Sequence, residues 1–92
     1  MNDYNELIST YFHLWNNHYG MMNGFGAKFN TEIKSINTFH EAYNAITRAY
    51  CFCRKVISNN TEQNDHLFKL IALQQDYDIA VKQIHYIKKY NK

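Results

Sequence analysis

Residues 61–92 decide the fold, and they read TEQNDHLFKLIALQQDYDIAVKQIHYIKKYNK. Apolar residues recur here at alternating intervals of three and four positions, the period of a helix packed along a partner. The members of this stripe are Leu70, Leu73, Tyr77, Ala80, Ile84 and Ile87. Two further stripes run beside it, namely Leu67, Ile71 and Val81, and Phe68, Ala72, Ile79, Tyr86 and Tyr90. A helix that is apolar around so much of its circumference needs more than one neighbour to bury it.

A second long helix is predicted directly before this one. Thr38 and Glu41 have the spacing of a capping box, in which hydroxyl and carboxylate satisfy amide groups of the first turn reciprocally. The apolar stripe that follows is rich in small side chains and consists of Phe39, Ala42, Ile46, Ala49, Cys53 and Val56. Residues 58–60 interrupt the pattern, and Asn60 and Gln63 have the spacing of a second cap. A break this short predicts two antiparallel neighbours, a helical hairpin.

The chain begins with a shorter predicted helix. Asp3 and Glu6 are suited to its first turn, and Tyr4, Ile8, Tyr11 and Trp15 form its apolar stripe. We expect it to cover residues 3–18 and to end at Gly20. Residues 20–37 hold all three glycines and little periodicity, which favours a functional or mobile loop with no more than one helical turn. The predicted fold is all-α: one domain over residues 1–92, built as a three-helix bundle.

The aromatic content predicts self-association. The chain has 92 residues, among them eight Tyr, six Phe and one Trp. A chain of this length buries only about 60–65% of its unfolded surface, so it cannot hide all of these rings. Tyr is enriched at protein interfaces. We therefore expect a homo-oligomer in which some of the rings meet another subunit or a ligand.

Charge and cysteine content restrict the cellular compartment and the kinds of partner that the sequence predicts. The net charge of +2 is too small to indicate a nucleic-acid binder, although residues 28–55 carry a local excess of +3. Cys51 and Cys53 point to different faces of a helix and cannot bridge each other there, which favours a reduced, cytoplasmic setting. No signal peptide or spanning helix is expected. Asn, Lys, Ile, Tyr and Phe, whose codons are A/T-rich, supply 43 of the 92 residues, as in many phages, mobile elements and bacteria. For a phage protein, the location would be the host cytoplasm.

No catalytic or metal-binding pattern is recognisable in the sequence. The five histidines lack the spacing of a zinc site, and they are read as ordinary helix-surface or half-buried residues. Asp76 and Asp78 diverge on a helix and cannot share a substrate, so they are read as solvated charges. We therefore predict a non-enzymatic protein that needs no cofactor and no metal.

Two groups of residues are candidates for ligand binding. Gly24, Phe25, Gly26 and Lys28 could bring backbone amides and an ammonium to a phosphate, close to Tyr11 and Trp15, on whose rings a base could stack. A plain flexible turn is the alternative reading of this segment. The second group consists of Arg48, Arg54 and Lys55. These three form either a phosphate-binding patch completed by a second subunit or a solvated helix face.

The succession of short helix, loop with Lys28, and capped hairpin resembles one family, the small phage anti-CBASS proteins that sequester cyclic-oligonucleotide immune signals. The resemblance concerns the layout of the whole chain. It implies a helical, oligomeric, non-enzymatic protein in which an aromatic residue of the first helix and a basic loop residue contact the ligand at subunit interfaces. Tyr11 and Lys28 are of suitable type and position for these two roles.

These observations predict a phage or mobile-element accessory factor that sequesters a cyclic oligonucleotide at subunit interfaces. The alternative is a helical inhibitor or adaptor that blocks a host defence or regulatory complex; it needs only an exposed aromatic helix face. Nucleic-acid binding through Arg48 and Lys55 is a third hypothesis, which the small net charge disfavours. The expected partners are a second copy of the chain and either a small nucleotide or a host protein, with no membrane.

Overall fold

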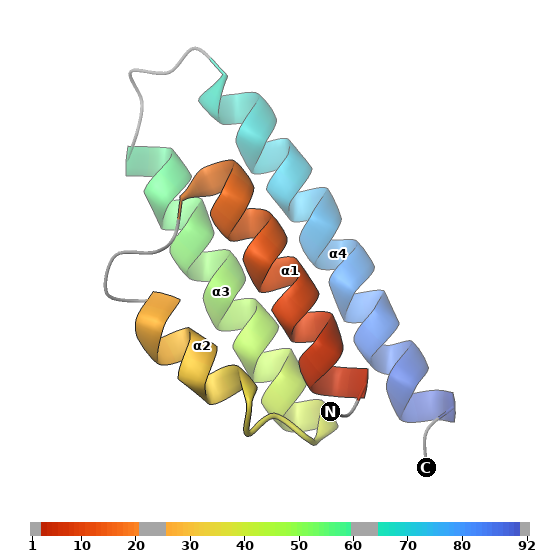
Figure 1. Ribbon diagram of the computed structural model, residues 1–92. Helices are drawn as coiled ribbons and strands as arrows, with labels where there is room; N and C mark the ends of the chain where they lie inside the picture. Colours follow the sequence, from red (N-terminus) through yellow and green to blue (C-terminus); the bar gives the residue numbers. More distant parts are fainter. Residues whose placement is uncertain (1–2, 21–25, 60–64, 91–92) are drawn as a thin grey trace.

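The computed structural model describes residues 3–20, 26–59 and 65–90, which form four α-helices and no strand (Figure 1). The helices are α1 (Asp3–Tyr19), α2 (Ala27–Ile33), α3 (Phe39–Asn59) and α4 (His66–Tyr90). The principal extents of 46 × 25 × 17 Å describe an elongated body. The expected all-α class is confirmed. Within the described residues, no helix is long and apolar enough to cross a membrane.

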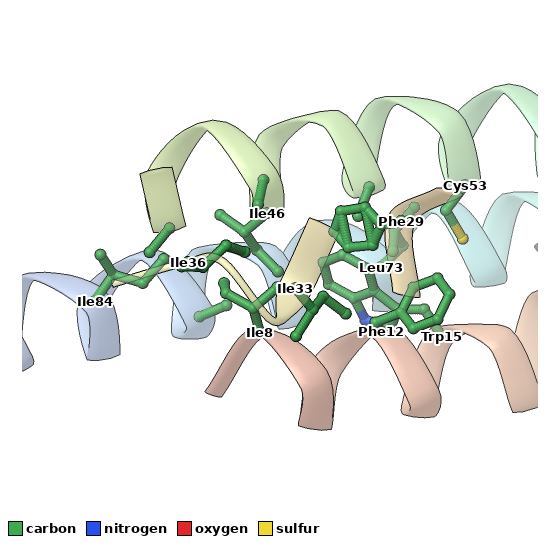
Figure 2. Packing of buried hydrophobic residues seen from close by; sticks show 14 of the residues in the cluster. Ile8, Phe12, Trp15, Phe29, Ile33, Ile36, Ile46, Cys53, Leu73 and Ile84 are labelled. Atoms are coloured by element: carbon green, nitrogen blue, oxygen red, sulfur yellow. The ribbon is translucent and has the colours of Figure 1, made fainter. Parts of the chain in front are cut away.

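The long helices α3 and α4 lie side by side and run in opposite directions, and α1 packs against both of them (Figure 1). Side chains from all four helices meet between them (Figure 2). The largest of the fully buried side chains are Trp15, Phe12, Phe29, Ile8, Ile46, Leu73, Ile84 and Cys53. The core is therefore the contact zone of three helices, extended at one end by α2.

Small side chains let α3 approach its neighbours closely. Ala42, Ala45, Ala49 and Cys53 are completely inaccessible to solvent. Such residues project little from the helix, so the axes of the adjacent helices can come near. The stripe predicted from the sequence is confirmed at its centre, whereas its end members Phe39 and Val56 are only half-buried.

The capping box at the start of α3 is confirmed. The Glu41 amide donates a hydrogen bond to Thr38 Oγ1 at 3.2 Å, and Thr38 Oγ1 donates to Glu41 Oε1 at 3.0 Å. The amide of Asn37 also donates to Glu41 Oε1, at 3.2 Å. These bonds lower the pKa of the Glu41 carboxyl, with the Asn37 amide as the largest cause. The helix start is thus fixed by local chemistry that the sequence shows directly. The cap predicted at Asn60 and Gln63 lies outside the described residues.

The prediction of a loop over residues 20–37 is wrong for part of this range, because residues 27–33 form α2. Gly20 does end α1 as expected: its φ is +69°, and its amide donates to the Asn16 carbonyl at 2.9 Å. Beyond it, Phe29, Ile33 and Ile36 are buried, and the Phe29 ring lies 4.9 Å from the Phe12 ring, centroid to centroid. Their spacing of four and three positions is a short helical repeat. The bundle has a fourth helix because this repeat covers the core.

Only one of the three apolar stripes of α4 faces the core. Leu73, Ala80 and Ile84 are buried, and Tyr77 and Leu70 are half-buried beside them. The large apolar side chains of the other two stripes are mostly exposed: Leu67, Phe68, Ile71, Ile79, Tyr86 and Tyr90. Among residues 3–20, 26–59 and 65–90 of one copy, α4 therefore has helical neighbours mainly along this one stripe.

Candidate functional site

The largest of the described hollows is a cavity of about 510 Å³ between α3 and α4. Its lining residues are Tyr50 and Arg54 from α3 and Leu70, Ile71, Gln74 and Gln75 from α4. Cavities of roughly 300–1,000 Å³ with apolar walls and a few polar groups are typical of small-molecule sites. We call this hollow the α3–α4 pocket.

A hydrogen-bonded chain holds one wall of the α3–α4 pocket in place. The Tyr50 hydroxyl donates to Gln74 Oε1 at 2.6 Å, and Gln74 Nε2 donates to Asp78 Oδ1 at 3.2 Å. Behind it, the Tyr50 ring stacks on the Tyr77 ring with centroids 4.4 Å apart, and the hydroxyls of Tyr77 and Thr47 lie 2.9 Å apart. Burial raises the pKa of the Tyr77 hydroxyl. Hydrogen bonds thus orient the Tyr50 hydroxyl and the Gln74 amide at this wall.

Arg54 supplies the positive charge of the α3–α4 pocket. It is exposed, and among residues 3–20, 26–59 and 65–90 no carboxylate forms an ion pair with it. A guanidinium in this position can make two parallel hydrogen bonds to a phosphate or a carboxylate. The pocket therefore combines one anion-binding group with the amides of Gln74 and Gln75 and the aliphatic side chains of Leu70 and Ile71.

Arg48 and Lys55 lie apart from this pocket, on the outer surface of α3. They line a hollow of about 330 Å³ together with Thr47, Cys51 and Phe52. Arg48 forms an ion pair with Glu32 of α2. Exposed pairs of this kind contribute roughly 0–1 kcal/mol to stability. The structure thus brings Arg48 and Lys55 together, as their spacing predicts, and places Arg54 on a different side of the helix.

Trp15 does not offer a stacking surface in this structure. It is 0% exposed, and its Nε1 donates to Asp76 Oδ2 at 3.3 Å. Tyr11 is half-buried: its ring centroid lies 5.8 Å from that of Trp15, and its hydroxyl donates to Gln83 Oε1 at 3.0 Å. Burial, and then the charge of Asp76, raise the pKa of Tyr11. The expectation that a base stacks on Trp15 is wrong for the single subunit because the ring belongs to the core.

The phosphate site predicted at Gly24, Phe25, Gly26 and Lys28 is described only in part. Gly24 and Phe25 lie outside the described residues. Gly26 is a buried residue with helical backbone angles, φ −61° and ψ −40°, directly before α2. Lys28 is exposed on α2 and lines none of the described hollows. Lys28 lies one helical turn before Glu32, the residue of α2 that pairs with Arg48 of α3.

Sequence reasoning missed most of the α3–α4 pocket, since only Arg54 was among the candidates. Tyr50, Gln74 and Gln75 were not among them. The sequence does contain one indication of this pocket. Gln74 and Gln75 interrupt the apolar surface of the last helix, and Tyr50 and Arg54 are four positions apart on the helix before it. In the described part of the chain, no three His, Cys, Asp or Glu side chains converge as metal ligands would.

No protein-family model, curated protein or solved structure matches this chain. Function is therefore inferred from the side chains of the α3–α4 pocket and from the exposed surfaces around it.

Proposed function

We propose that this chain is a non-enzymatic binding protein that self-associates and sequesters a small phosphate-bearing ligand with a planar base, of the cyclic-oligonucleotide class. The observation that supports this most directly is Arg54 at a pocket lined by amides and aliphatic side chains. The guanidinium binds phosphate, and the two Gln amides can both donate and accept hydrogen bonds at the edge of a base. Leu70 and Ile71 provide an apolar wall for the flat face of the base.

Sequestration accounts for this set of side chains better than turnover. The six residues around the pocket include no carboxylate, imidazole or thiol. Tyr50 is the one lining residue with a hydroxyl, and that hydroxyl already donates to Gln74. Such a pocket can bind and orient a ligand through one charge and several hydrogen bonds. The resemblance of the chain's layout to the phage sequestering proteins supports the same class of ligand.

Calorimetric titration with a panel of cyclic di- and trinucleotides tests the proposal. We expect at least one of them to bind, and Arg54→Gln to weaken that binding by about tenfold or more, since a charge-assisted pair is lost. Arg48→Gln is the matched control because Arg48 lies on another side of α3 and pairs with Glu32. No heat across the panel, or equal losses in both variants, would contradict the proposal.

The exposed apolar surface of α4 is the observation that favours the second candidate, a helical inhibitor or adaptor of a host complex. Phe68, Tyr86 and Tyr90 are exposed on this helix, and amphipathic helices bind protein grooves through such residues. In that case the chain would be monomeric and the surface would be free for the host protein. The oligomeric state therefore separates the two candidates.

A further inference from the structure

One stripe of α4 is exposed along its whole length and touches the rest of the bundle only at its margins, where Gln83 accepts a hydrogen bond from Tyr11 and Gln75 lines the α3–α4 pocket. Its seven members are Phe68, Ala72, Gln75, Ile79, Gln83, Tyr86 and Tyr90, and all of them are exposed. None carries a charge. We call this set the outer stripe. In Figure 1, α4 lies at the edge of the bundle, with α1 and α3 to one side of it.

We propose that the outer stripe binds the outer stripe of a second copy of this chain, with the two α4 helices antiparallel and Ile79 opposite Ile79. This inference deepens the self-association that is part of the proposed function, and it does not depend on the identity of a ligand. It specifies which surface pairs, in which direction and in which register.

The spacing of the outer stripe is the first argument. Its members follow at intervals of four, three, four, four, three and four positions, a series that reads the same in both directions. Phe68, Ile79 and Tyr90 are eleven positions apart, and an eleven-residue repeat keeps paired helices nearly straight or slightly right-handed. A stripe that is symmetric about Ile79 can meet a reversed copy of itself without losing register.

The side chains that would meet are complementary in size and type. In the antiparallel register, Phe68 lies opposite Tyr90, small Ala72 opposite large Tyr86, and Gln75 opposite Gln83. Gln83 Oε1 already accepts from Tyr11, and its Nε2 can donate to the facing Gln75. Facing aromatic rings favour each other beyond their buried area. Because large residues face small ones or other rings, two reversed copies can interdigitate.

Exposed area is the second argument. Phe68, Tyr86 and Tyr90 are 75%, 63% and 61% exposed. Since an aromatic side chain buries about 150–250 Å², these three rings alone offer about 400 Å² per copy. Ile79 in the stripe and Ile71 on its flank enlarge this patch. A pair would then bury on the order of 1,200 Å² in total, the lower bound for stable specific interfaces.

Charge beside the outer stripe is the third argument. Lys82 and Asp78 lie on the same flank of the stripe, and in an antiparallel two-fold pair the same flanks face each other. In the register centred on Ile79, Asp78 of one copy lies opposite residue 80 of the other. It is therefore two residues, or about 3 Å along the helix axis, from Lys82 of that copy. Opposite charges can thus meet twice at this interface.

The test is sedimentation of the full chain without any ligand at tens of micromolar concentration. We expect a dimer, and we expect Ile79→Lys to raise its dissociation constant by about tenfold or more, because a buried lysine would lie on the symmetry axis. Leu14→Lys is the matched control, since Leu14 is an exposed apolar residue on α1. Circular dichroism confirms that each variant is still helical. A monomeric wild type, or a dimer unaffected by Ile79→Lys, would overturn the pairing.

The register has its own test. Phe68→Glu and Tyr90→Lys should each be monomeric alone and form a heterodimer when mixed, because the new Glu and Lys then face each other. A mixture of Phe68→Glu with Tyr86→Lys should not recover, since residue 86 faces residue 72. Recovery in the second mixture and not in the first would overturn the register. Calorimetry on the Ile79→Lys monomer assesses the ligand separately, so that either proposal can fail while the other stands.

Discussion

Trp15 Nε1 donates a hydrogen bond to Asp76 Oδ2 at 3.3 Å, which ties the C-terminal half of α1 to the middle of α4. The indole ring is completely buried, whereas Asp76 is partly exposed at the edge of the core. A buried indole N–H requires an acceptor, and in this fold a carboxylate from sixty-one positions further along the chain provides it.

Replacing Asp76 by Ala should lower the free energy of unfolding by about 1–3 kcal/mol, because the buried Trp15 N–H loses its acceptor. Urea denaturation followed by tryptophan fluorescence measures this effect. Asn44→Ala, at an exposed position of α3, serves as the control and should change stability by no more than about 0.5 kcal/mol. An equal effect in both variants would show that the bond contributes nothing to stability.

Phe29→Ala tests whether α2 belongs to the core. Phe29 is 1% exposed and packs on Phe12, so its removal should leave a cavity and cost about 3–5 kcal/mol. Leu14→Ala removes an apolar side chain that is already exposed and should cost far less. Thermal unfolding of both variants gives the comparison. A Phe29→Ala protein as stable as Leu14→Ala would mean that α2 does not cover the core in solution.

The two cysteines should differ sharply in reactivity. Burial raises the pKa of the Cys53 thiol to about 12, whereas Cys51 is exposed. The thiolate is the reactive form, so a thiol reagent near neutral pH should modify Cys51 rapidly and Cys53 only after unfolding. Mass spectrometry of the native and the urea-denatured protein counts the labels. Labelling of both cysteines at similar rates in the native protein would show that α3 is oriented differently.

Glu41 predicts a dependence of stability on pH. Its pKa is lower in the folded chain than the ordinary value of 4.5, so folding favours the carboxylate. The stabilisation is therefore fully present above the unfolded pKa and is lost as the pH falls through the folded pKa. Melting temperatures of the wild type and Glu41→Gln should approach each other between about pH 6 and pH 3, as the wild-type carboxyl is protonated. If the difference in melting temperature stayed constant over this range, the Glu41 carboxylate would not be its cause.

Local patterns predicted the parts of this fold that local chemistry determines. The capping box depends on Thr38 and Glu41, three positions apart, and Gly20 ends α1 through its own backbone conformation. Both could be read from the sequence. The α2 helix was missed because only Phe29 and Ile33 of the short repeat lie within it, while Ile36 follows its end. Its place in the bundle depends on packing against α1, where Phe29 meets Phe12.

The candidate site was harder to predict, because periodicity shows which residues share a face and not which face is covered. On α1, the covered side is centred on Ile8, Phe12 and Trp15, and it turns Trp15 into a core residue while Tyr11 stays at the margin. The α3–α4 pocket depends on how two helices are aligned across a connection. Gln74 and Tyr50 meet only because of that alignment, which no short motif specifies.

Since the α3–α4 pocket spans the seam between the two longest helices, it ceases to exist when they separate. A molecule held there would bind only the folded chain and would stabilise it by mass action. At a free concentration of the molecule one hundred times its dissociation constant, the free energy of unfolding would rise by about 2.7 kcal/mol. The melting temperature of the protein is therefore a direct gauge of occupancy, by which whole metabolite collections can be screened before any single compound is suspected.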